Sequence, residues 1–267
     1  MVSSDFRATA RQKLTGKWGK AALMMLCYFA YALVLNYIES HTKGFLSFAV
    51  SIAVIVINIP IAYGLTMAYL KLYNDEEVGY FDFFTLGFEN FSRAWSVAWN
   101  IFLKVLVPFI LVVVSYVLIF VGIGGAAASS LVNYANSSSI NTTAINSFGA
   151  VSVIGMILLI VSAIWLTLKS FYYDLAQYVA IENPSMTGKE VAEESKRLMT
   201  NRRWKLFCLE FSFIGWAILA AFTFGIGIFW LAPYMLFATI AFYKNALGNK
   251  ETVVENPVEE TVENTEE

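Results

Sequence analysis

The stretch from Gly44 to Leu70 constrains the fold most, because it contains no Asp, Glu, Lys or Arg. As a helix, these 27 residues are about 40 Å long at a rise of about 1.5 Å per residue. The hydrocarbon core of a bilayer is about 30 Å thick, so such a helix crosses it with length to spare. Across all 267 residues, 58% are hydrophobic and 14% charged, a balance typical of membrane proteins. We therefore predict an all-α integral membrane protein.

Charge-poor windows of similar length recur and predict six transmembrane helices arranged as three hairpins. Their ranges are about 21–38, 46–70, 98–122, 149–168, 205–223 and 227–246. The uncharged connection 124–147 is rich in Gly, Ser, Asn and Thr, so we expect a loop on the outer side. The membrane domain is expected over 1–248, followed by a disordered acidic cytoplasmic tail over 249–267, where Glu is dense and aromatic residues are absent.

The distribution of Lys and Arg predicts the orientation of these helices. Of the 18 basic residues, 16 lie in the N-terminal arm, in the segments between hairpins or at the C-terminal end. The outer loops hold only Lys43, and Lys104 lies inside a span. Cytoplasmic segments of membrane proteins are enriched in Lys and Arg. We therefore expect a protein of the cell membrane with both termini in the cytoplasm.

The cytoplasmic segments themselves resemble short amphipathic helices lying in the membrane plane. "TGKEVAEESKRLMTNRRW" begins with a capping box formed by Thr187 and Glu190. One face of the helix that follows carries Val191, Ser195, Leu198 and Met199. The N-terminal arm has a similar order: a basic amphipathic turn, a leucine and a glycine, then an aromatic residue. A looser version occurs in "YFDFFTLGFENFSRAWSVAW".

Residues at the ends of these helices have expected roles of their own. Glu193 and Arg197 are spaced as an i,i+4 ion pair. Asn201 is expected to end its helix in the left-handed conformation. Trp18 and Trp204, which precede the first and fifth spans, are expected to be interfacial anchors at the level of the lipid headgroups.

Glycines and prolines interrupt the spans and predict turns, close packing and kinks. "TFGIG" holds Gly225 and Gly227 and is expected to be the tight external turn of the last hairpin. Gly215 lies within a span, where a missing side chain allows another helix to approach. Prolines remove a backbone donor and kink a helix unless neighbours bind the freed carbonyl, which we expect for Pro60, Pro108 and Pro233.

Lys104 and Glu210 are the two ionisable residues inside predicted spans. Each lies at a similar depth from the cytoplasmic side, about 8 to 10 Å at about 1.5 Å per residue, so they are a candidate intramembrane pair. A buried ion pair or a proton-linked site is the functional interpretation. The favoured interpretation is structural, because Lys near the interface extends its charged end to water and Glu can also reach it.

Signatures of enzymes and metal sites are missing from the sequence. His41 is the only histidine, and Cys27 and Cys208 both lie in apolar segments. No G-x-S-x-G, H-E-x-x-H, Walker A or paired C-x-x-C motif occurs. We therefore predict no catalytic residue, no cofactor-binding residue and no metal ligand.

The C-terminal third, "SKRLMTNRRWKLFCLEFSFIGWAILAAFTFGIGIFWLAPYMLFATIAFY", resembles the bacterial membrane proteins grouped as "domain of unknown function 975". Asn201 departs from the family, which usually has glycine there. The segments "YYDLAQYVAIENP" and "ARQKLTGKWGKA" are similar to further family elements, whereas 97–165 match poorly. The resemblance implies a multi-pass membrane protein, mostly from Gram-positive bacteria, and implies no activity. It is carried by Ser195, Lys196, Leu198, Met199, Trp204, Lys205, Phe207, the run Ser212 to Trp216, Thr223, Gly225, Ile226, Gly227, Trp230, Pro233, Tyr234, Phe242 and Tyr243.

Two functional hypotheses follow. The first is a non-catalytic protein that organises membrane lipid or binds a protein partner or a second copy of itself, with no nucleic acid involved; it is based on the aromatic in-plane segments, the basic arms and the acidic tail. The alternative is a small transporter or export component with a polar path near Lys104 and Glu210. Few polar residues lie within the predicted spans, which favours the first hypothesis.

Overall fold

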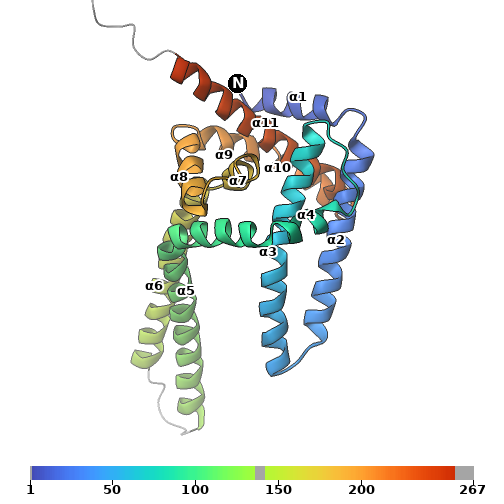
Figure 1. The fold of residues 1–267 in the computed structure, drawn as a ribbon. Helices are drawn as coiled ribbons and strands as arrows, with labels where there is room; N and C mark the ends of the chain where they lie inside the picture. Colours follow the sequence, from blue (N-terminus) through green and yellow to red (C-terminus); the bar gives the residue numbers. More distant parts are fainter. Residues whose placement is uncertain (1, 136–141, 256–267) are drawn as a thin grey trace, which may run out of the picture. The chain divides into compact units, whose positions relative to one another are not determined.

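The computed structural model describes the backbone of residues 2–135 and 142–255, and this part contains helices and no strand (Figure 1). The predicted all-α fold class is confirmed for these residues. The helices are α1 (Ser3–Leu14), α2 (Trp18–His41), α3 (Phe45–Tyr73), α4 (Asp82–Glu89), α5 (Phe91–Ala135), α6 (Thr142–Ser170), α7 (Ala176–Glu182), α8 (Gly188–Met199), α9 (Arg203–Phe211), α10 (Ile214–Phe222) and α11 (Ile228–Glu255).

Five helical stretches in the described residues are long and apolar enough to cross a membrane, which indicates a multi-pass membrane protein. They are Trp18–His41, Phe45–Tyr73, Phe91–Val132, Asn146–Ser170 and Arg203–Phe222. These stretches contain the first four predicted spans and most of the fifth. The last of them comprises α9 and α10, which are separated by a turn at Ser212 and Phe213. The sixth predicted span, 227–246, falls in α11, which is not among the five.

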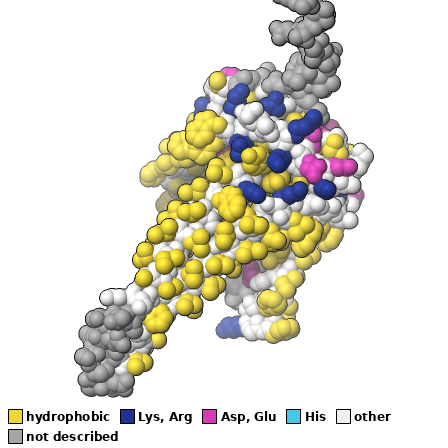
Figure 2. Space-filling model, turned by 90° about the vertical axis from the view of Figure 1, so that its left-hand side faces the viewer, with side chains coloured by type: hydrophobic (Ala, Val, Ile, Leu, Met, Phe, Trp, Pro, Cys, Tyr) yellow, Lys and Arg dark blue, Asp and Glu magenta, His cyan; other side chains and the backbone are white. Residues whose placement is uncertain are grey.

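The surfaces of these helices are covered with exposed apolar side chains. Phe45 is 86% exposed and Phe120 80% exposed. Figure 2 shows continuous hydrophobic stretches in which Lys, Arg, Asp and Glu side chains are scarce. Water-soluble proteins rarely expose apolar patches of this kind, so lipid is the expected covering.

The chain divides into two compact units. Unit 1 comprises Met1–Trp99 and Tyr173–Glu267, and unit 2 comprises Asn100–Tyr172. Unit 2 therefore contains α6 and most of α5, and unit 1 contains the other helices and the first residues of α5.

In unit 2, the long outer loop predicted over 124–147 is largely wrong, because α5 continues to Ala135 and α6 begins at Thr142. Glycines inside and beside this segment serve for close helix packing, with Gly125 inside it and Gly122 and Gly155 beside it. A Cβ added to Gly122 would lie 2.7 Å from the backbone oxygen of Phe148, and one added to Gly155 would lie 2.9 Å from a side-chain carbon of Ile119. Glycine thus lets the backbones of α5 and α6 approach each other.

In unit 1, α11 is the helix around which the others pack. Phe6 of α1 meets Phe242 edge-on at 5.3 Å between ring centroids, and Tyr178 of α7 stacks on Tyr243 at 5.6 Å. Figure 1 shows α1 lying along α11. Several α11 side chains are almost completely buried: Phe237, Ala238, Ile240, Ala241, Phe242, Tyr243 and Ala246. The second half of α11 is therefore covered by protein. The helix extends to Glu255, past residue 249, where we expected the tail to begin, and residues 256–267 lie outside the described part.

The proline in α3 has a partner for the carbonyl that it leaves free. Pro60 has no N–H, so the carbonyl of Val56, four residues earlier, lacks its helical donor. Trp95 Nε1 donates a hydrogen bond to this carbonyl at 3.2 Å. The indole of α5 therefore satisfies a backbone group that would otherwise be unpaired in an apolar region.

The same part of α3 approaches α4 through two facing glycines. A Cβ added to Gly64 would lie 2.8 Å from the Cα of Gly87. A Cβ added to Gly87 would lie 2.6 Å from the carbonyl oxygen of Pro60. The backbones of α3 and α4 are therefore in direct contact, and no larger residue fits at either glycine without a backbone shift.

A carboxylate at the end of α3 binds two lysines from the N-terminal arm. Asp75 Oδ2 lies 2.8 Å from Lys13 Nζ, and Asp75 Oδ1 lies 2.5 Å from Lys17 Nζ. Lys17 Nζ also donates to the carbonyl of Leu72 at 2.6 Å. The hydrogen bonds from Lys13 and Lys17 lower the pKa of Asp75 to about 2. This two-lysine clamp links α1 and the start of α2 to the end of α3.

The helix α8 follows the local signals of its sequence. Thr187 Oγ1 accepts from the backbone N–H of Glu190 at 3.3 Å, and the carboxylate of Glu190 accepts from the N–H of Thr187 at 2.7 Å. Asn201 has the expected left-handed conformation, with φ 62°. The expected apolar face is buried and comprises Val191, Ser195, Leu198 and Met199.

The ion pair predicted on α8 is wrong in its acidic partner. Arg197 pairs with Glu194, three residues earlier, through two bonds of 3.0 Å each, rather than with Glu193. Both spacings bring side chains together on a helix. The carboxylate of Glu194 accepts hydrogen bonds from two guanidinium nitrogens of Arg197 at once. Such a bidentate pair is stronger than a single hydrogen bond.

The contact between α3 and α4 can be tested by replacing Gly64 with Ala. The added methyl group must displace backbone, so we expect Gly64→Ala to destabilise the protein by about 1–3 kcal/mol, as overpacking of a core does. Gly149→Ala in α6 is the matched control, because a Cβ there meets no heavy atom within 4 Å. Thermal unfolding in detergent should show a lower midpoint for Gly64→Ala only, and equal midpoints would contradict the close contact.

The two-lysine clamp should weaken in acid. The pKa of Asp75 falls from 3.8 to about 2 on folding, so its contribution is complete above about pH 4 and is lost as the pH falls through 2. Asp75→Asn keeps a residue that tolerates the positive φ of 68° and removes the charge. Hydrogen-exchange protection of α1 should be lower by a few-fold in Asp75→Asn at pH 7. It should also no longer change between pH 4 and 2, whereas the neighbouring control Glu76→Gln should behave as the parent protein does.

Candidate functional site

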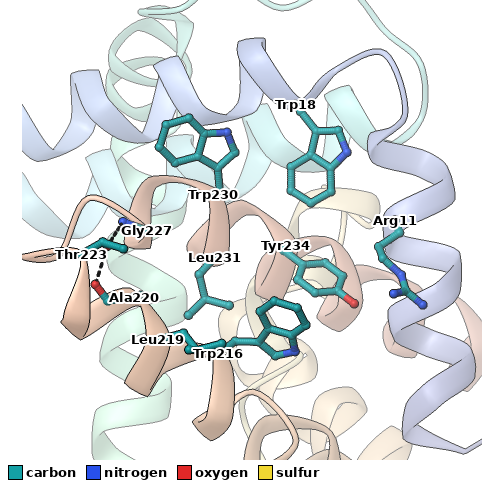
Figure 3. Close-up of a pocket in the computed structure, with 10 residues that line it drawn as sticks. All are labelled: Arg11, Trp18, Trp216, Leu219, Ala220, Thr223, Gly227, Trp230, Leu231 and Tyr234. Carbon is teal, nitrogen blue, oxygen red and sulfur yellow. Dashed lines mark hydrogen bonds between the residues drawn. The ribbon is translucent and has the colours of Figure 1, made fainter.

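A pocket of about 330 Å³ lies between α1, the start of α2, α10 and α11, all within unit 1 (Figure 3). Its walls are aromatic and aliphatic, and one charged side chain reaches it. The lining residues are Arg11, Trp18, Trp216, Leu219, Ala220, Thr223, Gly227, Trp230, Leu231 and Tyr234. Its volume falls within the range of about 300–1,000 Å³ that is typical of small-molecule sites.

The turn between α10 and α11 forms one end of the pocket. The tight turn is confirmed, but its predicted external position is wrong, because Phe229 just after it packs against Phe29, midway along the predicted span 21–38, at 5.4 Å between ring centroids. The turn occurs at the "TFGIG" segment, where Gly225 has a φ of 85° that favours glycine. Thr223 Oγ1 donates to the carbonyl of Ala220 at 2.7 Å and accepts from the N–H of Gly227 at 2.8 Å. A Cβ added to Gly227 would lie 2.9 Å from the Cα of Ala220, so the two helices meet closely here. The turn thereby places Trp216 of α10 across from Trp230 of α11.

Tyr234 stands at the middle of the pocket and is fixed from three sides. Its ring packs edge-on against Phe213 at 5.0 Å and lies 6.0 Å from the ring of Trp18. Its hydroxyl donates to the carbonyl of Arg7 at 3.4 Å. Figure 3 shows this hydroxyl directed toward the side of the pocket where Arg11 lies.

The chain bends sharply before Trp18, which brings that residue over α11. The helix α1 ends at Leu14, and Gly16 adopts a φ of 79° before α2 begins at Trp18. Leu14 is fully buried, so the end of α1 is held in place by packing. Arg11, one turn earlier on α1, therefore lies on the same side of the pocket as Trp18.

Arg11 supplies the positive charge of the pocket. Within the described part of the chain, its guanidinium forms no ion pair, whereas Lys13 and Lys17 nearby are bound to Asp75. The Nε of Arg7 is buried and makes no hydrogen bond to a described residue. An apolar molecule with one negative group fits these walls and this charge.

The predicted pair Lys104 and Glu210 is divided between the two units. Lys104 lies in α5 in unit 2, and Glu210 lies in α9 in unit 1, so their pairing stays a prediction. A charged neighbour of Glu210 is Asp174, between α6 and α7. Desolvation and, to a smaller extent, the charge of Glu210 raise the pKa of Asp174, although its side chain is exposed.

The other predicted residues fall at several places in the fold. Trp18 lines the pocket, and Trp204 is 73% exposed and stacks on Phe207 at 5.0 Å. A Cβ added to Gly215 meets no heavy atom within 4 Å, so no described helix of unit 1 packs closely on this glycine, and its packing role stays a prediction. Three prolines lie inside helices, namely Pro60 in α3, Pro108 in α5 and Pro233 in α11.

The pocket itself is not evident from helix periodicity, because its residues come from four separate segments. Arg11, Trp216, Trp230 and Tyr234 were not among the residues predicted to form a site. One signal was available, since Trp216, Thr223, Gly227, Trp230 and Tyr234 all belong to the residues that carry the family resemblance. Residues shared within a family at a pocket wall are candidates for function as well as packing.

Comparisons with known proteins agree with this resemblance. No curated protein and no solved structure matches the chain. A family model described as "Protein of unknown function (DUF975)" matches residues 1–250. This match covers far more than half of the 267 residues, and the chain therefore belongs to the DUF975 family.

Proposed function

We propose that this chain is a non-catalytic integral membrane protein that organises lipid, with both termini in the cytoplasm. The observation that carries the proposal is the aromatic pocket with Arg11 at its edge, directly beside a basic N-terminal arm. Basic segments next to a membrane attract anionic lipid by about 1 kcal/mol per Lys or Arg. The pocket has apolar walls and one cationic side chain, a combination that suits the binding of an anionic lipid.

The sixth predicted span, 227–246, does not cross the bilayer in this proposal, because α11 begins beside the middle of α2, where Phe229 packs against Phe29. Trp230, Pro233 and Tyr234 also reduce its hydropathy, while Ile228 and Trp230 remain about half exposed. The four long apolar helices α2, α3, α5 and α6 form an even number of spans, which leaves the basic segments on one side of the membrane. The helices α1 and α8 have one buried face and charged residues elsewhere, which supports an in-plane position at the cytoplasmic surface.

A small proton-linked transporter is the second candidate, and one observation favours it. Asp174 and Glu210 are two interacting carboxyl groups, and the charge of Glu210 contributes to a raised pKa of Asp174. Proton relays in membrane transporters are commonly built from such groups. In this alternative, Lys104 and Glu210 lie along the polar path.

Lipid enrichment around the protein tests the first candidate. The full-length chain is extracted in polymer discs together with its surrounding native lipid, and the lipid is compared with that of the bulk membrane. We expect anionic lipid to be enriched around the parent protein. The enrichment should fall in the double variant Arg7→Gln with Lys20→Gln and persist in Lys43→Gln, because Lys43 is expected on the other side of the membrane. A bulk-like composition around the parent protein would contradict the proposal.

A flux measurement tests the second candidate on the same protein. Proteoliposomes with a pH-sensitive dye inside should acidify under a proton gradient only if a proton path exists. A transporter should conduct, and Asp174→Asn should slow acidification because the exchangeable proton is lost. The matched control is Asp82→Asn, a carboxylate near the start of α4 that accepts from the N–H of Gly79. Acidification no faster than in empty vesicles would exclude proton transport.

A further inference from the structure

We propose that the aromatic pocket of unit 1 binds one acyl chain of an anionic membrane phospholipid, whose phosphate is held by Arg11. This inference rests on the proposed function and names the lipid class and the residues that select it. Three features of the described residues support it: the side from which the pocket is reached, the distribution of charge around it, and the nature of its walls.

The pocket is reached from an apolar surface. Trp216 and Leu219 form one wall and belong to the apolar stretch Arg203–Phe222, which is long enough to cross a membrane. Trp216 is 51% exposed and Leu219 58% exposed, so this wall continues onto the surface that lipid is expected to cover. An occupant therefore enters from the bilayer, and a lipid is already present there at high concentration.

The charge near the pocket selects an anionic headgroup. Lys13 and Lys17 are bound to Asp75, which leaves Arg11 as the charged residue of the lining. The planar guanidinium of Arg binds phosphate through paired hydrogen bonds and loses less on dehydration than the ammonium of Lys. The Tyr234 hydroxyl lies on the same side of the pocket and is a further polar group for a headgroup. A zwitterionic lipid brings a second positive charge close to Arg11 and is therefore disfavoured.

The walls suit a flexible hydrocarbon chain. Trp18, Trp216 and Trp230 contribute large rings to the lining, and Leu231 lies among them. The volume of about 330 Å³ lies near the lower end of the range for small-molecule sites, of about 300–1,000 Å³. We therefore assign a single acyl chain to the pocket, with the second chain of the same lipid remaining in the bilayer.

Native mass spectrometry of the full-length protein in detergent tests this assignment. The probes are dioleoyl phosphatidylglycerol, which is anionic, and dioleoyl phosphatidylcholine, which has the same chains and no net charge. We expect one phosphatidylglycerol to bind more tightly than any phosphatidylcholine. Arg11→Gln should weaken phosphatidylglycerol binding on the order of fivefold, because one charge near the surface is lost. Leu219→Trp, which fills the mouth of the pocket, should remove the tightly bound lipid.

Two control variants keep the test specific. Arg197→Gln removes an arginine that pairs with Glu194 outside the pocket. Ile218→Trp adds an indole next to Leu219 on α10, where the side chain is 54% exposed and does not line the pocket. Both controls should bind phosphatidylglycerol as the parent protein does.

Three outcomes would overturn the assignment. Equal binding of both lipids by the parent protein would remove the basis for an anionic ligand. Undiminished phosphatidylglycerol binding in both Arg11→Gln and Leu219→Trp would place the lipid elsewhere. Loss of a dimer, instead of lipid, in Leu219→Trp would identify a second copy of the chain as the occupant. The proposed function is judged separately by lipid enrichment in native discs, which can persist when the pocket assignment fails.

Discussion

The packing of α1 against α11 determines where the polar groups of the pocket lie. Phe6 and Leu14 are buried with the apolar residues of α11, and this contact fixes the rotation of α1 about its own axis. Arg11 then lies beside the pocket, while Lys13 lies toward Asp75. An isolated helix of 12 residues is only marginally stable in water, so α1 depends on this tertiary contact for its structure.

Asp75 determines which basic residues of the N-terminal arm are already paired. By binding Lys13 and Lys17, it satisfies two of the cations that precede the first apolar helix. Arg11 lines the pocket and forms no ion pair within the described part of the chain. The basic arm is thus divided into a structural part, which joins α1 to α3, and a part that is available to a ligand.

The sequence predicted the helical class, the membrane environment and most local signals near α8, because these depend on residues close together in the chain. The capping box at Thr187, the buried face of α8 and the left-handed Asn201 are examples. Contacts between residues far apart in the chain could not be predicted from the sequence. The facing glycines Gly64 and Gly87 belong to different helices, and hydropathy alone does not show which glycine meets which.

Composition led to a wrong prediction where a loop and closely packed helices favour the same residue types. Small residues between 124 and 147 suit a loop, but α5 and α6 occupy the described part of this segment, and Gly125 faces the side chain of Phe148 there. The pocket was missed for a related reason. Trp216 and Trp230 each look like ordinary membrane-facing aromatic residues in their own helix, and only the turn at Gly225 brings them to one site.

The hydrogen bond between Trp95 and the carbonyl of Val56 has a consequence for how this protein tolerates change over evolution. The indole is needed because Pro60 cannot supply an N–H, so the two positions are expected to vary together. A chain that replaces Pro60 with an ordinary helix-forming residue regains the missing backbone N–H and no longer requires an indole N–H at position 95. A chain that loses only the indole leaves a carbonyl unpaired at a depth where water is scarce, and such a single change is expected to be selected against.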